Sequence, residues 1–192
     1  GPPLQWGFAS SPILHHGTII VQCDVISGKF LAAFRAEDSH ELWRTRRDED
    51  TSWCTPTLET GGGRRQIIVN GYRHIAGHDS DTGQERWRLN GGGDIPVPTP
   101  VVAHGLVFLT SAHGKYRPMR AIRPDALGDI TPSELERTNA AIAWVHPRQG
   151  SYMQTPIVVG DLLYGCHDTG VLTCFDARTG RGYLDMFTFF AS

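Results

Sequence analysis

Ile75-Ala76-Gly77-His78-Asp79-Ser80-Asp81-Thr82-Gly83-Gln84-Glu85-Arg86-Trp87 is the stretch that decides the fold. It contains a short apolar strand, a turn with the pattern Asp-x-x-Thr-Gly, and a second strand that carries a tryptophan. Glycine at the end of this turn suits a backbone position with positive φ. The same turn recurs at 176–180 as Asp-Ala-Arg-Thr-Gly and ends in Gly180, which indicates an internal repeat.

Two further landmarks recur at a common interval. A Ser/Thr-Pro step places prolines at 12, 56, 100 and 156, with spacings of 44, 44 and 56 residues. Trp43, Trp87 and Trp144 keep nearly the same interval, with spacings of 44 and 57 residues. Both landmarks place an excess of about a dozen residues in the third unit, between Pro100 and Trp144.

Within each unit the residues are typical of β-strands. A short apolar strand follows the Ser/Thr-Pro step, and after a glycine turn comes a second strand such as Ile67-Ile68-Val69 or Leu106-Val107-Phe108-Leu109. Four strands in about 44 residues, repeated, predict the four-stranded antiparallel blades of a β-propeller. We expect one partial propeller domain over residues 1–192, with blades at about 7–46, 50–90, 94–146 and 151–186.

The extra residues of the third unit predict a short helix. Thr131-Pro132-Ser133-Glu134 offers a capping residue, a proline at the first helical position and a carboxylate near the helix start. We expect one or two helical turns over Ser133–Asn139, inserted in the third blade. A surface decoration is favoured over a lid.

The Ser/Thr-Pro step, the Asp-x-x-Thr-Gly turn and the tryptophan four positions after its glycine together resemble the pyrroloquinoline-quinone-type propeller repeat. The resemblance covers residues 5–184. It implies that Trp43, Trp87 and Trp144 pack between adjacent blades, beside the turns that end in Gly83 and Gly180. The first unit departs from the pattern because Asp38-Ser39-His40-Glu41 replaces the glycine turn. In the last unit Leu184 takes the place of the tryptophan.

Relatives of this repeat type generally have seven or eight blades, so four blades would form an open arc with uncovered edges. We therefore expect the remaining blades of a longer chain, or self-association, to cover those edges. The formal charge of −2 gives no basic surface for nucleic acid. No apolar run approaches the ~20 residues of a membrane-spanning helix.

An enzyme of this superfamily would be an alcohol or sugar dehydrogenase that uses pyrroloquinoline quinone with calcium. Such enzymes typically carry adjacent cysteines near the cofactor, whereas Cys23, Cys54, Cys166 and Cys174 are all separated in this sequence. No compact group of calcium ligands or spacing of a metal site stands out. We therefore expect no catalytic residue, cofactor or metal, and keep a fragment of a quinone-dependent dehydrogenase as the alternative. A disulfide between Cys166 and Cys174 is one interpretation of their hairpin, and buried free thiols are favoured.

The loop before each inner strand and the hairpin after the second strand share one face of a propeller, around the axial funnel. Aromatic and hydrogen-bonding side chains on these segments suit a protein, peptide or glycan ligand. The candidate binding residues are Trp6, Phe8, Trp53, Tyr72, Arg73, His113, Tyr152, Gln154, His167 and Asp168. The alternative for Trp53, Tyr152 and Met153 is packing between blades, and the sequence does not decide between the two. The function that we expect is a non-catalytic scaffold or binding module, periplasmic or secreted by resemblance alone.

Overall fold

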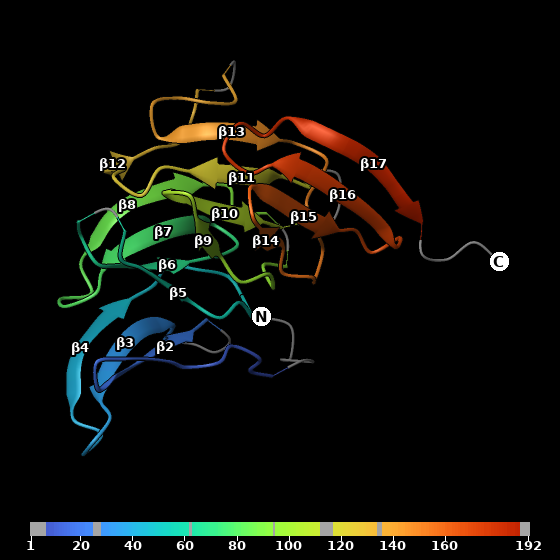
Figure 1. The fold of residues 1–192 in the computed structure, drawn as a ribbon. Helices are drawn as coiled ribbons and strands as arrows, with labels where there is room; N and C mark the ends of the chain where they lie inside the picture. The colour runs from blue at the N-terminus through green and yellow to red at the C-terminus, as the bar shows by residue number, and fades with distance from the viewer. Residues whose placement is uncertain are drawn as a thin grey trace.

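The computed structural model describes residues 7–24, 28–61, 63–93, 95–111, 117–133 and 136–188, which form four sheets in chain order (Figure 1). We call these sheets blades 1 to 4. Blade 1 holds β1 (Ile13–His15), β2 (Thr18–Cys23), β3 (Phe30–Arg35) and β4 (Glu41–Arg46), and blade 2 holds β5 (Thr57–Glu59), β6 (Gln66–Val69), β7 (His74–Asp79) and β8 (Glu85–Asn90). Blade 3 holds β9 (Val101–Ala103), β10 (Leu106–Thr110), β11 (Met119–Ile122) and β13 (Ile142–His146), and blade 4 holds β14 (Ile157–Val159), β15 (Leu162–Cys166), β16 (Val171–Asp176) and β17 (Gly182–Thr188). The prediction of four-stranded antiparallel blades is confirmed.

The four blades share one register. Each pairs its first strand with its second, its second with its third and its third with its fourth, always antiparallel. A bulge interrupts the pairing of the third and fourth strands at the equivalent place in every blade, for example between Gly77 and His78. Bulges increase the local twist of a sheet, which suits blades that pack against twisted neighbours. The inner strands β5, β9 and β14 lie next to one another across the blades.

The Ser/Thr-Pro step has a physical reason, because hydrogen bonds at these steps join neighbouring blades. The backbone N–H of Ser11 donates to Oγ1 of Thr55 in the next blade, at 3.0 Å, and the N–H of Thr99 donates to Oγ1 of Thr155 at 3.1 Å. Between blades 2 and 3, Oγ1 of Thr57 donates to the carbonyl oxygen of Pro100 at 2.6 Å. These bonds satisfy backbone groups that no strand pairs.

The predicted helix over Ser133–Asn139 is wrong, because the described part of this segment is a loop. Side chains satisfy its backbone instead. Asn139 Oδ1 accepts from the N–H groups of Ala141 and Ile142, and Asn139 Nδ2 donates to the carbonyl of Ile130 at 2.8 Å. Such local side-chain bonds compete with helix formation. No helix long and apolar enough to cross a membrane occurs within the described residues.

The insertion also adds a strand to a neighbouring blade. β12 (Gly128–Asp129) pairs parallel with β8, so blade 2 becomes a five-stranded sheet. Figure 1 shows β12 beyond β8, at the outer edge of blade 2, although its chain segment belongs to blade 3. A strand edge that would otherwise be exposed is thereby covered.

Candidate functional site

Four loops, one from each blade, meet around a hollow of about 340 Å³. We call them lead-in loops, because each leads into the inner strand of its blade: β1, β5, β9 or β14. The hollow is lined by Ala9, Trp53, Ile95, Val97, Tyr152 and Met153. Trp53 and Tyr152 are among the predicted binding residues, and the structure brings them to the same hollow. We call this lining the funnel surface.

Trp53 is fixed in place by its neighbours on both sides. Its backbone N–H donates to the carbonyl of Pro96 at 3.0 Å, and its indole N–H donates to the carbonyl of Gly7 at 3.0 Å. The residue thus joins the lead-in loops of blades 1, 2 and 3. An aromatic side chain held in this way offers a large contact area that loses little entropy on binding. The two interpretations of Trp53, interblade packing and a place on the binding surface, are compatible in this geometry.

The lining of the hollow contains one strained residue. Ile95 has a φ of 51°, in the left-handed region that β-branched side chains rarely adopt. Such a conformation costs on the order of 1–3 kcal/mol and is often found where a loop serves a ligand. The Met153 side chain is exposed beside it, at 55%. The hollow therefore combines apolar exposure with a backbone that the surrounding structure holds in place.

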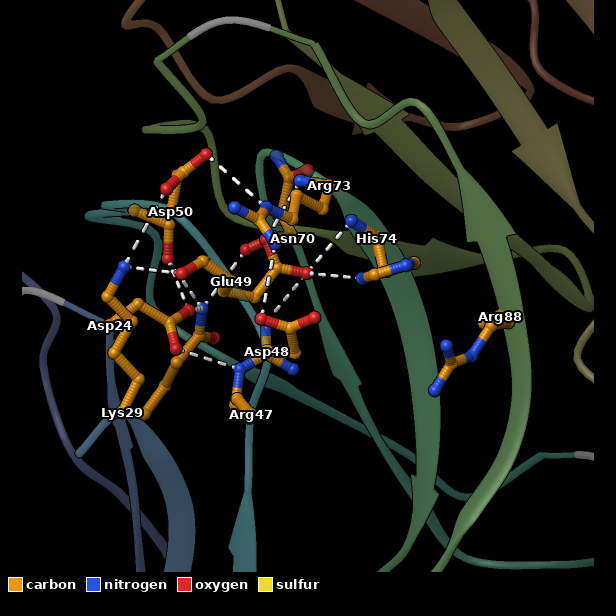
Figure 2. Close-up of polar contacts among 12 residues, drawn as sticks. Asp24, Lys29, Arg47, Asp48, Glu49, Asp50, Asn70, Arg73, His74 and Arg88 are labelled. Atoms are coloured by element: carbon orange, nitrogen blue, oxygen red, sulfur yellow. Dashed lines mark hydrogen bonds and ion pairs between the residues drawn. The ribbon is translucent and has the colours of Figure 1, made fainter. Parts of the chain in front are cut away.

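A buried polar cluster holds the lead-in loop that carries Trp53 (Figure 2). Arg47 Nε donates to Asp24 Oδ1 at 2.8 Å, and the two side chains are 4% and 0% exposed. Asp24 Oδ2 also accepts from Ser52 Oγ at 2.6 Å and from Gln22 Nε2 at 2.8 Å. Ser52 directly precedes Trp53, so these bonds fix the loop at its centre. A buried ion pair needs such additional hydrogen bonds to offset the loss of hydration.

Glu49 connects this cluster to blade 2. Its carboxylate accepts from the backbone N–H groups of Arg73 and His74, each at 2.8 Å, and lies 3.1 Å from Nδ1 of His74. Burial raises the pKa of Glu49, and the neighbouring Arg47 opposes that rise. Burial likewise disfavours the charge of Arg47, but the carboxylates of Asp24 and Glu49 outweigh it and the pKa of Arg47 is raised. The two blades therefore meet through charged groups shielded from water.

Arg73, a predicted binding residue, serves the same junction. Its guanidinium lies 3.2 Å from Asp48 Oδ1 and 3.3 Å from Asp50 Oδ2, and Figure 2 shows Arg73 together with these two aspartates of the lead-in loop of blade 2. Lys29, which belongs to blade 1, donates to the backbone carbonyl of Glu49. These ion pairs are partly exposed, so each contributes little to stability on its own. Arg73 thus contacts the lead-in loop that carries Trp53, and it is absent from the described lining of the hollow.

The cysteines are free thiols in the described structure. Cys54 donates to Asn70 O at 3.0 Å, and burial raises the pKa of its thiol to about 12. It is therefore protonated at neutral pH and does not have the thiolate that a nucleophile needs. Cys166 pairs with Leu172 and Cys174 pairs with Tyr164, so the two cysteines are not cross-strand partners. The disulfide interpretation is therefore wrong, and both cysteines are free thiols, as the favoured interpretation had it, with Cys174 buried and Cys166 partly buried.

The other predicted binding residues that the structure describes are outside the lining of the hollow. Phe8 and Tyr72 are exposed, at 58% and 41%. Gln154 accepts from the N–H of Met153 at 3.2 Å. Asp168 lies 3.6 Å from Arg117, and His167 closes a turn through its backbone. Trp6 and His113 fall outside the described residues.

Sequence reasoning missed the polar cluster. Arg47 and Glu49 received no role. Their signal is the charge-dense segment 44–50, Arg-Thr-Arg-Arg-Asp-Glu-Asp, which begins in β4 and continues past its end. Charged residues at that density are usually solvated, so their burial depends on contacts from the next blade, which a single unit of the repeat does not reveal.

The funnel surface does not fit a quinone with calcium. Calcium is bound by six to eight oxygen atoms, largely from carboxylates and amides. None of the described lining residues of the hollow carries a side-chain carboxylate or amide. No group of three or more His, Cys, Asp or Glu residues able to hold a metal ion occurs in the described part of the chain.

The comparisons with known proteins agree with this fold. The sequence profile of the family described as "Outer membrane protein assembly factor BamB" matches residues 3–183. No curated protein sequence matches the chain significantly.

Solved structures of the same fold include BamB from Moraxella catarrhalis, at 17% identity and a TM-score of 0.64, with 92% of this chain covered. A quinohemoprotein alcohol dehydrogenase from Comamonas testosteroni has 12% identity and a TM-score of 0.66, with 94% of this chain covered. At such low identity the likeness shows the fold alone. The chain spans 50% of the length of the first protein and 35% of the second.

Proposed function

Because the chain belongs to the family of the outer membrane protein assembly factor BamB, we propose that it is a non-catalytic, protein-binding part of a propeller in the bacterial envelope. One observation carries this proposal: four lead-in loops from four blades line one apolar hollow. A site that every blade helps to build suits a scaffold, because a partner bound there contacts all four blades at once. The periplasm, or secretion from the cell, is the location that the family suggests.

The occupant that fits the hollow is an extended peptide segment of a partner protein. Ala9, Ile95, Val97 and Met153 offer no side-chain N–H or O–H group, so they suit an apolar side chain better than a sugar. A volume of about 340 Å³ accommodates one or two such side chains. Trp53 and Tyr152 supply aromatic faces of the kind that dominate binding at protein interfaces.

A labelled peptide tests this function. The protein should raise the fluorescence anisotropy of a fluorescein-labelled hexapeptide with a central Leu-Phe pair, and the rise should saturate. Met153→Glu should weaken that binding at least ~10-fold, or about 1.4 kcal/mol. Leu127→Glu is the matched control, because Leu127 is 61% exposed and lies outside the lining of the hollow. Equal binding by both variants would remove the proposed site. If a maltooligosaccharide displaced the labelled peptide and the unlabelled peptide did not, the ligand would be a glycan and not a peptide.

A second binding surface is the face of blade 4 that points away from blade 3, which we call the outer face of blade 4. Val101 and Phe108 of blade 3 pack in a cluster that includes Leu163 and Phe175 of blade 4. The equivalent positions of blade 4 by register are Ile157 and Tyr164, and Ile157 is 59% exposed.

The opposite end of the arc is exposed as well, since Leu14 of blade 1 is 71% exposed. Leu14 is the register equivalent of Val158, which packs against blade 3. One end thus has the face that receives a blade, and the other end has the face that docks onto one. We propose that a second copy of this chain covers them, with blade 1 of one copy packed against blade 4 of the other.

The dehydrogenase alternative has a direct test. A real site for quinone and calcium would raise the melting temperature when both are added, because a ligand that binds only the folded state stabilises it. We expect no shift, since the described residues do not fit the group. A saturable rise of several degrees would restore the enzyme hypothesis.

A further inference from the structure

A second hollow, of about 490 Å³, lies between blade 2, blade 3 and the insertion. Its floor is apolar and includes Leu89 and Ile142, which are 1% and 2% exposed and belong to the core between the two blades. Its outer wall includes Thr131, Ser133 and Arg137 from the insertion. The excess residues of the third unit thus build a cavity for which blades 1, 2 and 4 have no corresponding segment.

The start of the insertion wall is held against blade 2 by hydrogen bonds. Oγ1 of Thr131 accepts from the backbone N–H of Asn90 at 2.9 Å, and Asp129 Oδ2 accepts from Nδ2 of Asn90 at 3.1 Å. Asp129 also pairs with Arg88 in the parallel ladder of β12 and β8. A wall fixed in this way loses little entropy when a ligand binds.

The charged side chains in the described lining of the hollow are mostly basic. Arg120, Arg137 and Arg148 line it, against one carboxylate, Glu136, among the described lining residues. Arg120 is 5% exposed and donates to the carbonyl of Gly91 at 3.2 Å, so its charge lies at the base of the hollow. Arg137 and Arg148 are exposed at the rim. Three guanidinium groups around one partly enclosed space attract anions.

We propose that this hollow binds a small anion that carries a carboxylate or phosphate group on an apolar body. The guanidinium group presents paired N–H donors that match the oxygens of a carboxylate or phosphate. The apolar floor takes the body of the ligand, and the volume falls in the range of small-molecule sites. The site is separate from the funnel surface, so it does not depend on the proposed peptide binding.

Calorimetry with three related probes tests the proposal. Phenyl phosphate and phenylacetate carry the two candidate anionic groups, and phenylacetamide is the neutral counterpart. We expect at least one anion to bind with a Kd of about 1 mM or tighter, and the amide to bind at least ~10-fold more weakly. The stronger of the two anions identifies the preferred group. Raising the ionic strength should weaken the binding of the anion and leave the binding of the amide unchanged.

Charge-removing variants locate the binding. The double variant Arg137→Gln/Arg148→Gln changes exposed side chains and should fold normally, with anion affinity reduced at least ~10-fold. Arg64→Gln/Arg181→Gln is the matched control, because both arginines are exposed and neither lines the hollow. Failure of both anions to bind would overturn the proposal. An equal loss in both double variants would also overturn it, because the anions would then respond only to net charge.

Discussion

The indole of Trp43 lies against Gly83 so closely that a Cβ atom on the glycine would be 2.3 Å from Cε3 of the ring. Trp43 belongs to blade 1, and Gly83 ends the Asp-x-x-Thr-Gly turn of blade 2. The indole N–H also donates to the carbonyl of Ser80 in the same turn, at 3.2 Å. Trp144 and Gly180 repeat the arrangement between blades 3 and 4, where the indole donates to Ala177 O at 3.0 Å. The tryptophan and the turn therefore form one interblade contact.

Gly83→Ala should destabilise the protein more than an ordinary glycine substitution does. The φ of 72° costs the new side chain about 1 kcal/mol, and the clash with Trp43 adds about 1–3 kcal/mol by displacing a packed ring. Gly17→Ala is the matched control, since Gly17 has a φ of 75° and no atom within 4 Å of the added Cβ. Urea unfolding of both variants measures the difference. Equal losses would mean that Trp43 does not dock on this turn.

Arg47→Met should remove about 3–5 kcal/mol from the free energy of unfolding, because it leaves the buried carboxylate of Asp24 without its cation. Adding Asp24→Asn should recover part of this loss, so the double variant is more stable than the sum of the single effects. Arg35→Met is the control: its ion pair with Asp38 is about half exposed, so its loss should change the free energy of unfolding little. Strict additivity of the two cluster substitutions would contradict the account of the cluster.

His78 should make the protein less stable in mild acid. Burial lowers its pKa from 6.5 to about 4. The unfolded chain therefore binds a proton below pH 6.5, whereas the folded chain does so only near pH 4. The free energy of unfolding falls as the pH falls through this window, by about 1.4 kcal/mol for each pH unit. His78→Asn removes the titrating group and retains a donor for the bond of Nδ1 to Gly83 O.

Urea unfolding at pH 7 and pH 4.5 measures this effect as the difference between the two proteins. The parent should lose more stability on acidification than His78→Asn does. If the two lose the same amount, the ring is protonated in the folded state as readily as in the unfolded chain.

Self-association should depend on the outer face of blade 4. Sedimentation equilibrium should show a dimer at concentrations on the order of 10 μM, and Ile157→Lys/Val159→Lys should give monomers, because a charge on the docking face opposes burial. Leu127→Lys, another exposed leucine, should leave the dimer intact. A parent chain that stays monomeric throughout this range contradicts the proposed second copy.

The repeat was sufficient to predict the blades, since the strands are specified by local residues and many of the turns by a glycine. Ile67–Val69 and Leu106–Leu109 lie in strands as expected. Trp87 shows the limit of the repeat, because its indole donates to Gln66 Oε1 of its own blade at 2.9 Å. Blade 3 has no Asp-x-x-Thr-Gly turn to receive the Trp87 indole. Ala126 and Ile130 of the insertion instead belong to the hydrophobic cluster that contains Trp87.

The site was predicted only in part, for a related reason. Trp53 and Tyr152 could be identified because aromatic residues stand out in a loop, whereas Ile95 and Val97 look like ordinary linker residues. The insertion was expected to be helical because its first residues resemble a helix cap. The structure instead satisfies its backbone through Asn139 and through pairing with β8, contacts that depend on the tertiary fold.

Methyl NMR of methionine tests the central claim, that the funnel surface binds a peptide segment. The chain has only three methionines, so the spectrum of protein labelled at the methionine methyl groups is simple. Met153 lines the hollow, and Met119 is fully buried in the core between blades 3 and 4. Titration with the Leu-Phe hexapeptide should shift the Met153 signal saturably and leave Met119 unchanged. An unmoved Met153 signal at saturating peptide would contradict the account.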